Sequence, residues 1–357
     1  MSLGRRLSMT GLLGGMAALA GCTSIGPRSL NRDQLDYTRA ISESSKRQTL
    51  FNLVRMRYGD APSFVAINQL VSSYSLQSSG SGGFGAFQSS FTRWGLLGGL
   101  QYTDTPTFTL QPVVGDQFVE AYLRPLAPDE VLPLIQSGIP ANRLFWLALQ
   151  SIGPLQNSQP LGRGRHTGSA EFYEVLDLIR QVQDAGGLGV EVRKTKDRNR
   201  AFLIFDTRHL PHMAPLVQQI YRLLRVSQPS SSRLVEVFYG HDGGPAGRAA
   251  IPIMTRSLLG VMAAISAEIE VPQADVEARR TLQTLREPGD QRHVLSIQSG
   301  AEPPPRAYAA VQIEETWFWV ADNDMSSKLT FSILQLLKAI AESTQDTSSA
   351  VLTIPTR

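Results

Sequence analysis

Cysteine is nearly absent from this sequence, because Cys22 is the only one among its 357 residues. A single thiol excludes an intramolecular disulfide, so hydrophobic cores have to stabilise the fold without a covalent staple. The chain is long enough to bury sizeable cores, and its length favours two domains.

A charge excess of either sign is also missing. Charged residues make up 18% of the chain, against 42% for apolar ones, and 34 Lys and Arg oppose 31 Asp and Glu. Loss of residues 1–21, which is argued below, removes Arg5 and Arg6 and leaves 32 basic residues against the same 31 acids. Nucleic-acid binding depends on a clear basic excess, so we expect no nucleic-acid partner.

Motifs of common catalytic and cofactor sites are lacking too. No Gly-x-Ser-x-Gly elbow, phosphate loop or Rossmann glycine fingerprint occurs in a suitable strand and helix context. His209 and His212 flank Pro211 without an acidic or Cys partner beside them, which favours capping over metal binding. Asp322-Asn-Asp324 lacks the Gly of a calcium loop and is interpreted as a turn that caps the next helix. We therefore predict a non-enzymatic protein with no cofactor and no metal site.

The first residues have the parts of a secretory signal. Arg5 and Arg6 precede a short apolar stretch that ends in Leu19-Ala20-Gly21-Cys22. This tetrapeptide resembles the lipobox of bacterial lipoproteins. The resemblance implies that residues 1–21 are a signal peptide and that the Cys22 thiol is acylated. The alternative is an ordinary signal peptide followed by a chance Cys.

Acylation also predicts a location. Several acyl chains make a stable tether, at about 0.8 kcal/mol per buried CH2. Thr23 follows Cys22, where proteins retained at the inner membrane usually have Asp. We expect a protein that is anchored in outer-membrane lipid and faces the periplasm, with residues 22–33 as its tether.

An N-terminal domain is predicted over residues 34–186. Its apolar and polar patterns predict a helix over 34–58, a long hairpin over 63–110 and a helical cluster. The cluster comprises helices at 116–123, 128–136, 143–152 and 171–184, with Asn142 as the cap of the third.

The hairpin 63–110 is unusual because aromatic residues are interspersed in its Gly/Ser-rich middle. Trp94, Leu96, Leu100 and Tyr102 share one parity, as on the apolar face of a strand, and together they form a candidate membrane face. Alternation in the first arm is imperfect, because Val65, Ile67 and Val71 have one parity and Tyr74 and Leu76 the other.

A C-terminal α+β domain is predicted over residues 187–357, with a strand–strand–helix–strand unit that occurs twice. The first unit has strands at 190–193 and 201–205, a helix at 213–225 and a strand at 234–239. The second has strands at 307–313 and 317–320, a helix at 329–341 and a closing strand at 351–354. Between the units we expect helices at 256–269 and 275–286 and a strand at 293–297.

Two smaller features are candidate binding surfaces. Trp317, Phe318 and Trp319 are consecutive, so at least one ring faces away from the core, either under the helix 329–341 or as a partner surface formed by Trp317 and Trp319. Arg163, Arg165 and His166 form a basic loop that can hold an anion such as a lipid or glycan phosphate, or simply be solvated.

The overall fold class predicted is α+β, and two functions remain open. Segments 53–58 and 317–324, with Ser327-Lys328, resemble those of uncharacterised bacterial lipoproteins, a family that implies no activity. The first hypothesis is a scaffold or adaptor for other envelope proteins. The second is a homo-oligomeric outer-membrane pore to which each copy contributes hairpin 63–110 in a shared barrel, an organisation that loosely resembles the lipoprotein channel for curli. An enzyme with dispersed catalytic residues is the third and least supported alternative.

Overall fold

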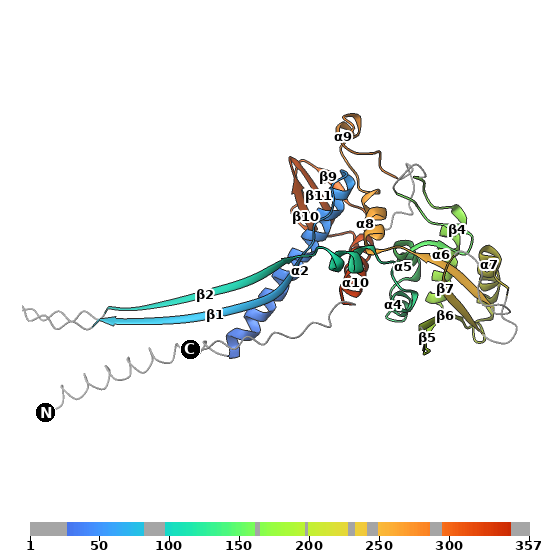
Figure 1. The fold of residues 1–357 in the computed structure, drawn as a ribbon, viewed down its shortest axis with the longest axis horizontal. Helices are drawn as coiled ribbons and strands as arrows, with labels where there is room; N and C mark the ends of the chain where they lie inside the picture. Colours follow the sequence, from blue (N-terminus) through green and yellow to red (C-terminus); the bar gives the residue numbers. More distant parts are fainter. Residues whose placement is uncertain are drawn as a thin grey trace, which may run out of the picture. The chain divides into compact units, whose positions relative to one another are not determined.

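The computed structural model describes residues 27–81, 97–160, 165–196, 199–227, 233–240, 249–285 and 295–343, and the fold is α+β as predicted (Figure 1). The chain forms two compact units. The larger unit contains the described residues up to Pro62 and those from Ala121 onwards, and the smaller one is Ser63–Glu120. Cys22, Trp94, Leu96 and the predicted strand 351–354 lie outside the described residues.

The smaller unit is the predicted hairpin. Strands β1 (Val65–Ser81) and β2 (Leu97–Pro112) pair antiparallel from Val65↔Pro112 to Ser81↔Leu97, as drawn in Figure 1. The register shifts once, between Ile67 and Gln69. After β2, the predicted helix 116–123 forms as α3 (Asp116–Phe118) followed by the π-helical turn η2 (Val119–Leu123).

The larger unit contains a six-stranded sheet with the order β4-β3-β8-β7-β6-β5. Neighbouring strands pair antiparallel except for β7 and β8, which are parallel. The strands are β3 (Leu149–Ile152), β4 (Leu155–Gln156), β5 (Leu188–Lys194), β6 (Asn199–Phe205), β7 (Leu234–Tyr239) and β8 (Ala250–Thr255). This sheet crosses the predicted domain boundary at 186/187, because β3 and β4 precede the boundary and pair with strands that follow it.

Helices from the central part of the chain pack on this sheet. α4 contacts β6 and β7, whereas α6 contacts α5, α7, β4 and β5. Ser169 caps the start of α6 by accepting a hydrogen bond from the Phe172 N–H (3.2 Å), and Gly186 ends the helix with a left-handed φ of 78°. The helices are α4 (Pro128–Val131), η3 (Leu132–Ile135), α5 (Ala141–Ala148), α6 (Ala170–Asp184), η4 (Pro211–Met213) and α7 (Ala214–Leu224).

The first and last segments of the chain meet in the same unit. A three-stranded sheet has the order β10-β11-β9, and α2 contacts β10 and α8, while α10 contacts β11, α8 and α5. Leu53, Phe318 and Phe331 are almost fully buried in this core. The elements are α2 (Pro27–Arg57), α8 (Leu258–Ser266), α9 (Gln273–Glu277), β9 (Gln298–Gly300), β10 (Ala307–Ile313), β11 (Thr316–Ala321) and α10 (Met325–Ser343).

Two predicted helices have different bounds. α2 begins at Pro27, so it includes residues 27–33 of the segment that was interpreted as a tether. The predicted helix 143–152 is wrong in its second half, because α5 ends at Ala148 and residues 149–152 form β3. Pairing of β3 with β8 overrides the helical periodicity there. Asn142 lies inside α5, not at its N-cap, which is Pro140.

The predicted charged helix 275–286 is also too long, and the next strand is displaced. α9 covers only Gln273–Glu277, and Arg279 has a left-handed φ of 58° that ends it. Beyond this turn the Thr281 hydroxyl donates to the carbonyl oxygen of Arg57 (2.6 Å), so a tertiary contact replaces helix propagation. The strand expected at 293–297 is β9 at Gln298–Gly300.

The two predicted repeat units differ in their third strand. In the first unit β7 follows the helix and pairs with β6. In the second unit the place beside β11 is taken by β9, which precedes the hairpin in sequence. The common part within the described chain is therefore strand–strand–helix. The Asp322–Asp324 turn caps α10 as predicted, because Asp324 Oδ1 accepts from the Ser327 N–H (3.0 Å).

Arg256 links the six-stranded sheet to the helical core, because it lies between β8 and α8 and is only 6% exposed. Its guanidinium donates to the carbonyl oxygens of Trp146 (2.8 Å), Leu147 (3.3 Å) and Ser158 (2.6 Å). Trp146 and Leu147 are in the last turn of α5, where carbonyls lack intrahelical partners and the helix dipole favours a cation. Burial lowers the pKa of Arg256 to about 10, so it stays protonated at neutral pH.

We expect Arg256→Met to lower the free energy of unfolding by about 4 kcal/mol, because it leaves buried carbonyl oxygens without donors. Urea unfolding of the detergent-solubilised chain, followed by tryptophan fluorescence, measures the change. The control Arg39→Met alters an exposed arginine of α2 whose side chain is 77% exposed, and should cost less than about 0.5 kcal/mol. A loss below about 1 kcal/mol for Arg256→Met would contradict this role.

Candidate assembly surfaces

The hairpin is a sheet of two strands without a third strand among the described residues. Each strand therefore has one edge whose backbone N–H and C=O groups have no ladder partner there. Isolated two-stranded hairpins are at best marginally stable in water, and long bare edges are sites for pairing with another chain. The length of these strands, 17 and 16 residues, makes the hairpin the first candidate for an assembly surface.

The register shift at Asn68 explains the imperfect alternation of the first arm. A bulge adds one residue to one strand, so residue parity on the two sides of it refers to opposite faces. Ile67 pairs with Leu110 before the shift, and Leu70 pairs with Phe108 after it. Val65 and Ile67 therefore occupy the same face of the sheet as Leu70, Tyr74 and Leu76, although their sequence parity differs.

With this register, one face of the hairpin consists mostly of apolar positions and the other of polar positions. The first face has Val65, Ile67, Leu70, Ser72, Tyr74, Leu76, Leu100, Tyr102, Asp104, Pro106, Phe108, Leu110 and Pro112. The second has Ala66, Gln69, Val71, Ser73, Ser75, Gln77, Gln101, Thr103, Thr105, Thr107, Thr109 and Gln111. Leu100 and Tyr102, which were predicted as part of a membrane face, fall together on the apolar one. Leu110 is 61% exposed.

The hairpin arms also lack the charges that usually protect an edge. Asp104 is the single Asp, Glu, Lys or Arg in the two strands, whereas water-exposed edge strands commonly contain Lys. Pro106 and Pro112 of β2 are even-numbered, whereas Val113, whose N–H donates to Phe64 O (3.0 Å), is odd-numbered. Successive N–H groups of a strand point to opposite sides, so the even-numbered positions face away from β1. Proline has no N–H to donate, so these positions suit the outer edge of the strand.

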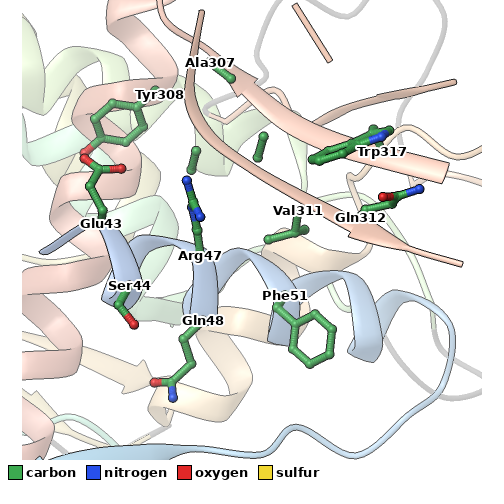
Figure 2. Close-up of a pocket in the computed structure, with 12 residues that line it drawn as sticks. Glu43, Ser44, Arg47, Gln48, Phe51, Ala307, Tyr308, Val311, Gln312 and Trp317 are labelled. Carbon is green, nitrogen blue, oxygen red and sulfur yellow. The ribbon is translucent and has the colours of Figure 1, made fainter. Parts of the chain in front are cut away.

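A groove between α2 and β10 is the second candidate surface, with a volume of about 700 Å³. Figure 2 shows Tyr308 and Trp317 towards its two ends and Arg47 projecting from α2 towards β10. The ring of Tyr308 makes a cation–π contact with Lys46, whose Nζ lies 4.5 Å from the ring centroid. β10 pairs only with β11 among the described strands, so the groove runs along a sheet edge.

The three consecutive aromatic residues divide between the core and this surface. Phe318 is 1% exposed and packs edge to face against Tyr58 at 6.1 Å. Trp317 is half-buried and lines the groove with Phe51, which is 40% exposed. Trp319 is also half-buried, and its Nε1 donates to Gln298 Oε1 (2.9 Å). The sequence indicated Trp317 but not Arg47 or Phe51, because α2 meets β10 only in the folded chain.

The other candidate residues of the sequence analysis are His209, His212 and the basic loop. His209 and His212 are exposed, and His212 lies in η4. The part of the chain that the structure describes contains no group of three or more His, Cys, Asp and Glu arranged to hold a metal ion. Arg163 lies outside the described residues, His166 forms an isolated bridge with Gln159, and Arg165 lines a different pocket. Among the described helices, none is long and apolar enough to cross a membrane.

The fold and these surfaces define an α+β protein with a separate long hairpin. Comparison with family models, with curated proteins and with solved structures finds no match for this chain.

The groove assignment predicts losses of stability of different size for two neighbouring residues of β11. Phe318→Ala should lower the free energy of unfolding by about 3–5 kcal/mol, because it empties a core site. Trp317→Ala should cost about 1 kcal/mol, because its ring lines the open groove and is only partly buried. Urea unfolding of both variants measures the difference, and equal losses would contradict the assignment of Trp317 to an open surface.

Proposed function

We propose that this protein is a non-enzymatic, lipid-anchored subunit of an oligomeric outer-membrane pore, and that copies of its β1–β2 hairpin pair edge to edge in one shared sheet. The observation that carries the proposal is the isolated two-faced hairpin. Pairing between copies provides partners for both bare edges, which no other described strand of the chain does.

The alternation of the two faces supports a membrane location for this shared sheet. Strands that cross a membrane alternate apolar residues towards lipid with polar residues towards water. The bulge at Asn68 brings β1 into line with β2, so the pattern holds across both strands. Ala66 and Val71 on the polar face and Ser72 and Asp104 on the apolar face are the exceptions. Acidic residues cost less than Lys or Arg on a lipid-facing strand.

The length of the apolar face also fits a membrane. It extends from Val65 to Leu76 on β1 and from Leu100 to Pro112 on β2, and Gly and Ser dominate beyond it. About 12 residues at about 3.3 Å each, tilted by about 40°, advance about 30 Å. The hydrocarbon core of a bilayer has about this thickness.

The anchor belongs to the same proposal. Cys22 lies outside the described residues, and its acylation rests on the lipobox resemblance of Leu19-Ala20-Gly21-Cys22. An anchor in outer-membrane lipid would hold each copy at the membrane surface and raise the local concentration of hairpins. The polar Thr and Gln face would then line the aqueous side of the pore.

Adjacent lysine substitutions on β2 test the proposal. Phe108→Lys places a charge on the apolar face at a cost of about 2–4 kcal/mol near the membrane midplane, and should abolish conductance of the purified protein in planar bilayers. Thr107→Lys is the matched control on the opposite face, and should retain conductance while shifting ion selectivity towards anions.

Loss of conductance in both variants, with native assembly, would contradict the assignment of the two faces. Absence of conductance in the wild-type protein would contradict the pore itself. Circular dichroism of both lysine variants should match that of the wild type. This control distinguishes a failure to insert into the membrane from a failure to fold.

A scaffold or adaptor for other envelope proteins is the second candidate, and the α2–β10 groove favours it. The groove combines a free sheet edge with aromatic and charged side chains, including Trp317, Arg47 and Glu43. An extended peptide can add to such an edge through its main chain, with side-chain pockets for specificity. If the protein is an adaptor, both lysine variants should retain the complex with its partner. If it is a pore, Thr107→Lys should retain conductance and Phe108→Lys should lose it.

A further inference from the structure

A pocket with several arginines lies beside the C-terminal end of α2. Its volume is about 520 Å³, and four arginines line it together with apolar residues such as Pro160: Arg57, Arg165, Arg279 and Arg280. We call it the arginine pocket. None of the described residues that line it is acidic. Arg279 and Arg280 are exposed to solvent, whereas Arg165 is partly buried and Arg57 is buried. Solvation alone therefore does not explain why Arg57 and Arg165 lie in the pocket.

Arg57 is the most buried of the four, with 6% exposure. Its Nη2 donates to Leu282 O (2.7 Å) and Thr284 Oγ1 (3.2 Å), and its Nε to Ile269 O (3.3 Å). These acceptors are all neutral. They satisfy the N–H groups and fix the side chain, but they leave its positive charge without a counter-ion among the described residues.

Arg165 adds a second charge and an unsatisfied donor. Its Nη2 donates to the carbonyl oxygen of Gln283, whereas its Nε is buried without a hydrogen-bond partner among the described residues. Burial and then the charge of Arg165 lower the pKa of Arg57 to about 10. Arginine stays protonated at neutral pH, so the two positive charges repel each other, in agreement with the lowered pKa of Arg57.

Arg279 and Arg280 reach the same pocket because the chain turns after α9. The left-handed backbone of Arg279, with φ of 58°, ends α9 and brings two consecutive arginines to the pocket. Arg280 Nη1 lies 3.5 Å from Asp275 Oδ1, and Asp275 Oδ2 accepts from the Tyr58 hydroxyl (2.7 Å). Arg280 therefore has a carboxylate partner in Asp275, and no described ion pair involves Arg57, Arg165 or Arg279.

We propose that the arginine pocket binds the phosphate group of a small ligand. A phosphate brings several acceptor oxygens and up to two negative charges, which suits several guanidinium groups that lack a counter-ion. The volume of about 520 Å³ exceeds that of a phosphate alone, so the phosphate is carried on a larger group. A soluble sugar phosphate and the head group of a phospholipid share this chemistry. The site is independent of the hairpin and of the proposed pore.

Calorimetric titration of the detergent-solubilised full chain tests the proposal with inorganic phosphate, glucose 1-phosphate and glycerol 3-phosphate. We expect a Kd of about 1 mM or tighter for at least one of them. Tighter binding of glucose 1-phosphate supports a sugar phosphate as the ligand, and tighter binding of glycerol 3-phosphate supports a lipid head group.

Arg165→Gln and Arg279→Gln should each weaken binding at least tenfold without changing the melting temperature of the free protein. Arg57 is left intact because its hydrogen bonds stabilise the fold. Arg39→Gln is the matched control, because Arg39 lies on α2 outside the pocket with a side chain 77% exposed. No binding of any of the three compounds at about 10 mM, or equal affinity in all variants, would overturn the proposal.

Discussion

The larger unit depends on the hydrogen bonds of one buried guanidinium group, that of Arg256. Arg256 reaches the last carbonyl groups of α5 and the backbone of Ser158, and so joins a helix end, the loop after β4 and the start of α8. Asn157 completes the arrangement, because its Nδ2 donates to Trp146 O (2.8 Å) and Leu149 O (2.7 Å). These bonds satisfy the carbonyl groups where the chain changes from helix to strand. The change at Ala148 is therefore stabilised by side chains that are distant in sequence.

The smaller unit is constrained in the opposite way, because its stabilisation has to come from outside the hairpin. Two strands have no interior, and neither face of β1–β2 can be a core by itself. An apolar face, a polar face and arms with Asp104 as their single charge are consistent with one environment, a sheet shared between copies in a membrane.

Local patterns predicted the elements whose stability is local. The helix predicted over 171–184 is α6, and the strands β5 to β7 also follow from the apolar periodicity of their sequences. Residues 149–152 were misassigned because Ile152 continues the helical spacing of Leu144 and Ala148, and the partner strand β8 is known only from the fold. Ile67 and Tyr74 share a face but differ in sequence parity, because a bulge lies between them. Only the register of the two strands identifies this bulge. Of the arginine pocket the sequence indicated only Arg165, because Arg57, Arg279 and Arg280 come from two other segments of the chain.

The mass of the detergent-extracted native complex shows whether copies of the chain assemble through the β1–β2 hairpin. Light scattering of the wild-type chain should give a homogeneous particle whose mass is a multiple of one chain. Removal of residues 66–111 should reduce it to the mass of a monomer, while circular dichroism still reports the folded larger unit. A wild-type monomer, or an oligomer that survives removal of the hairpin, would contradict assembly through a shared sheet.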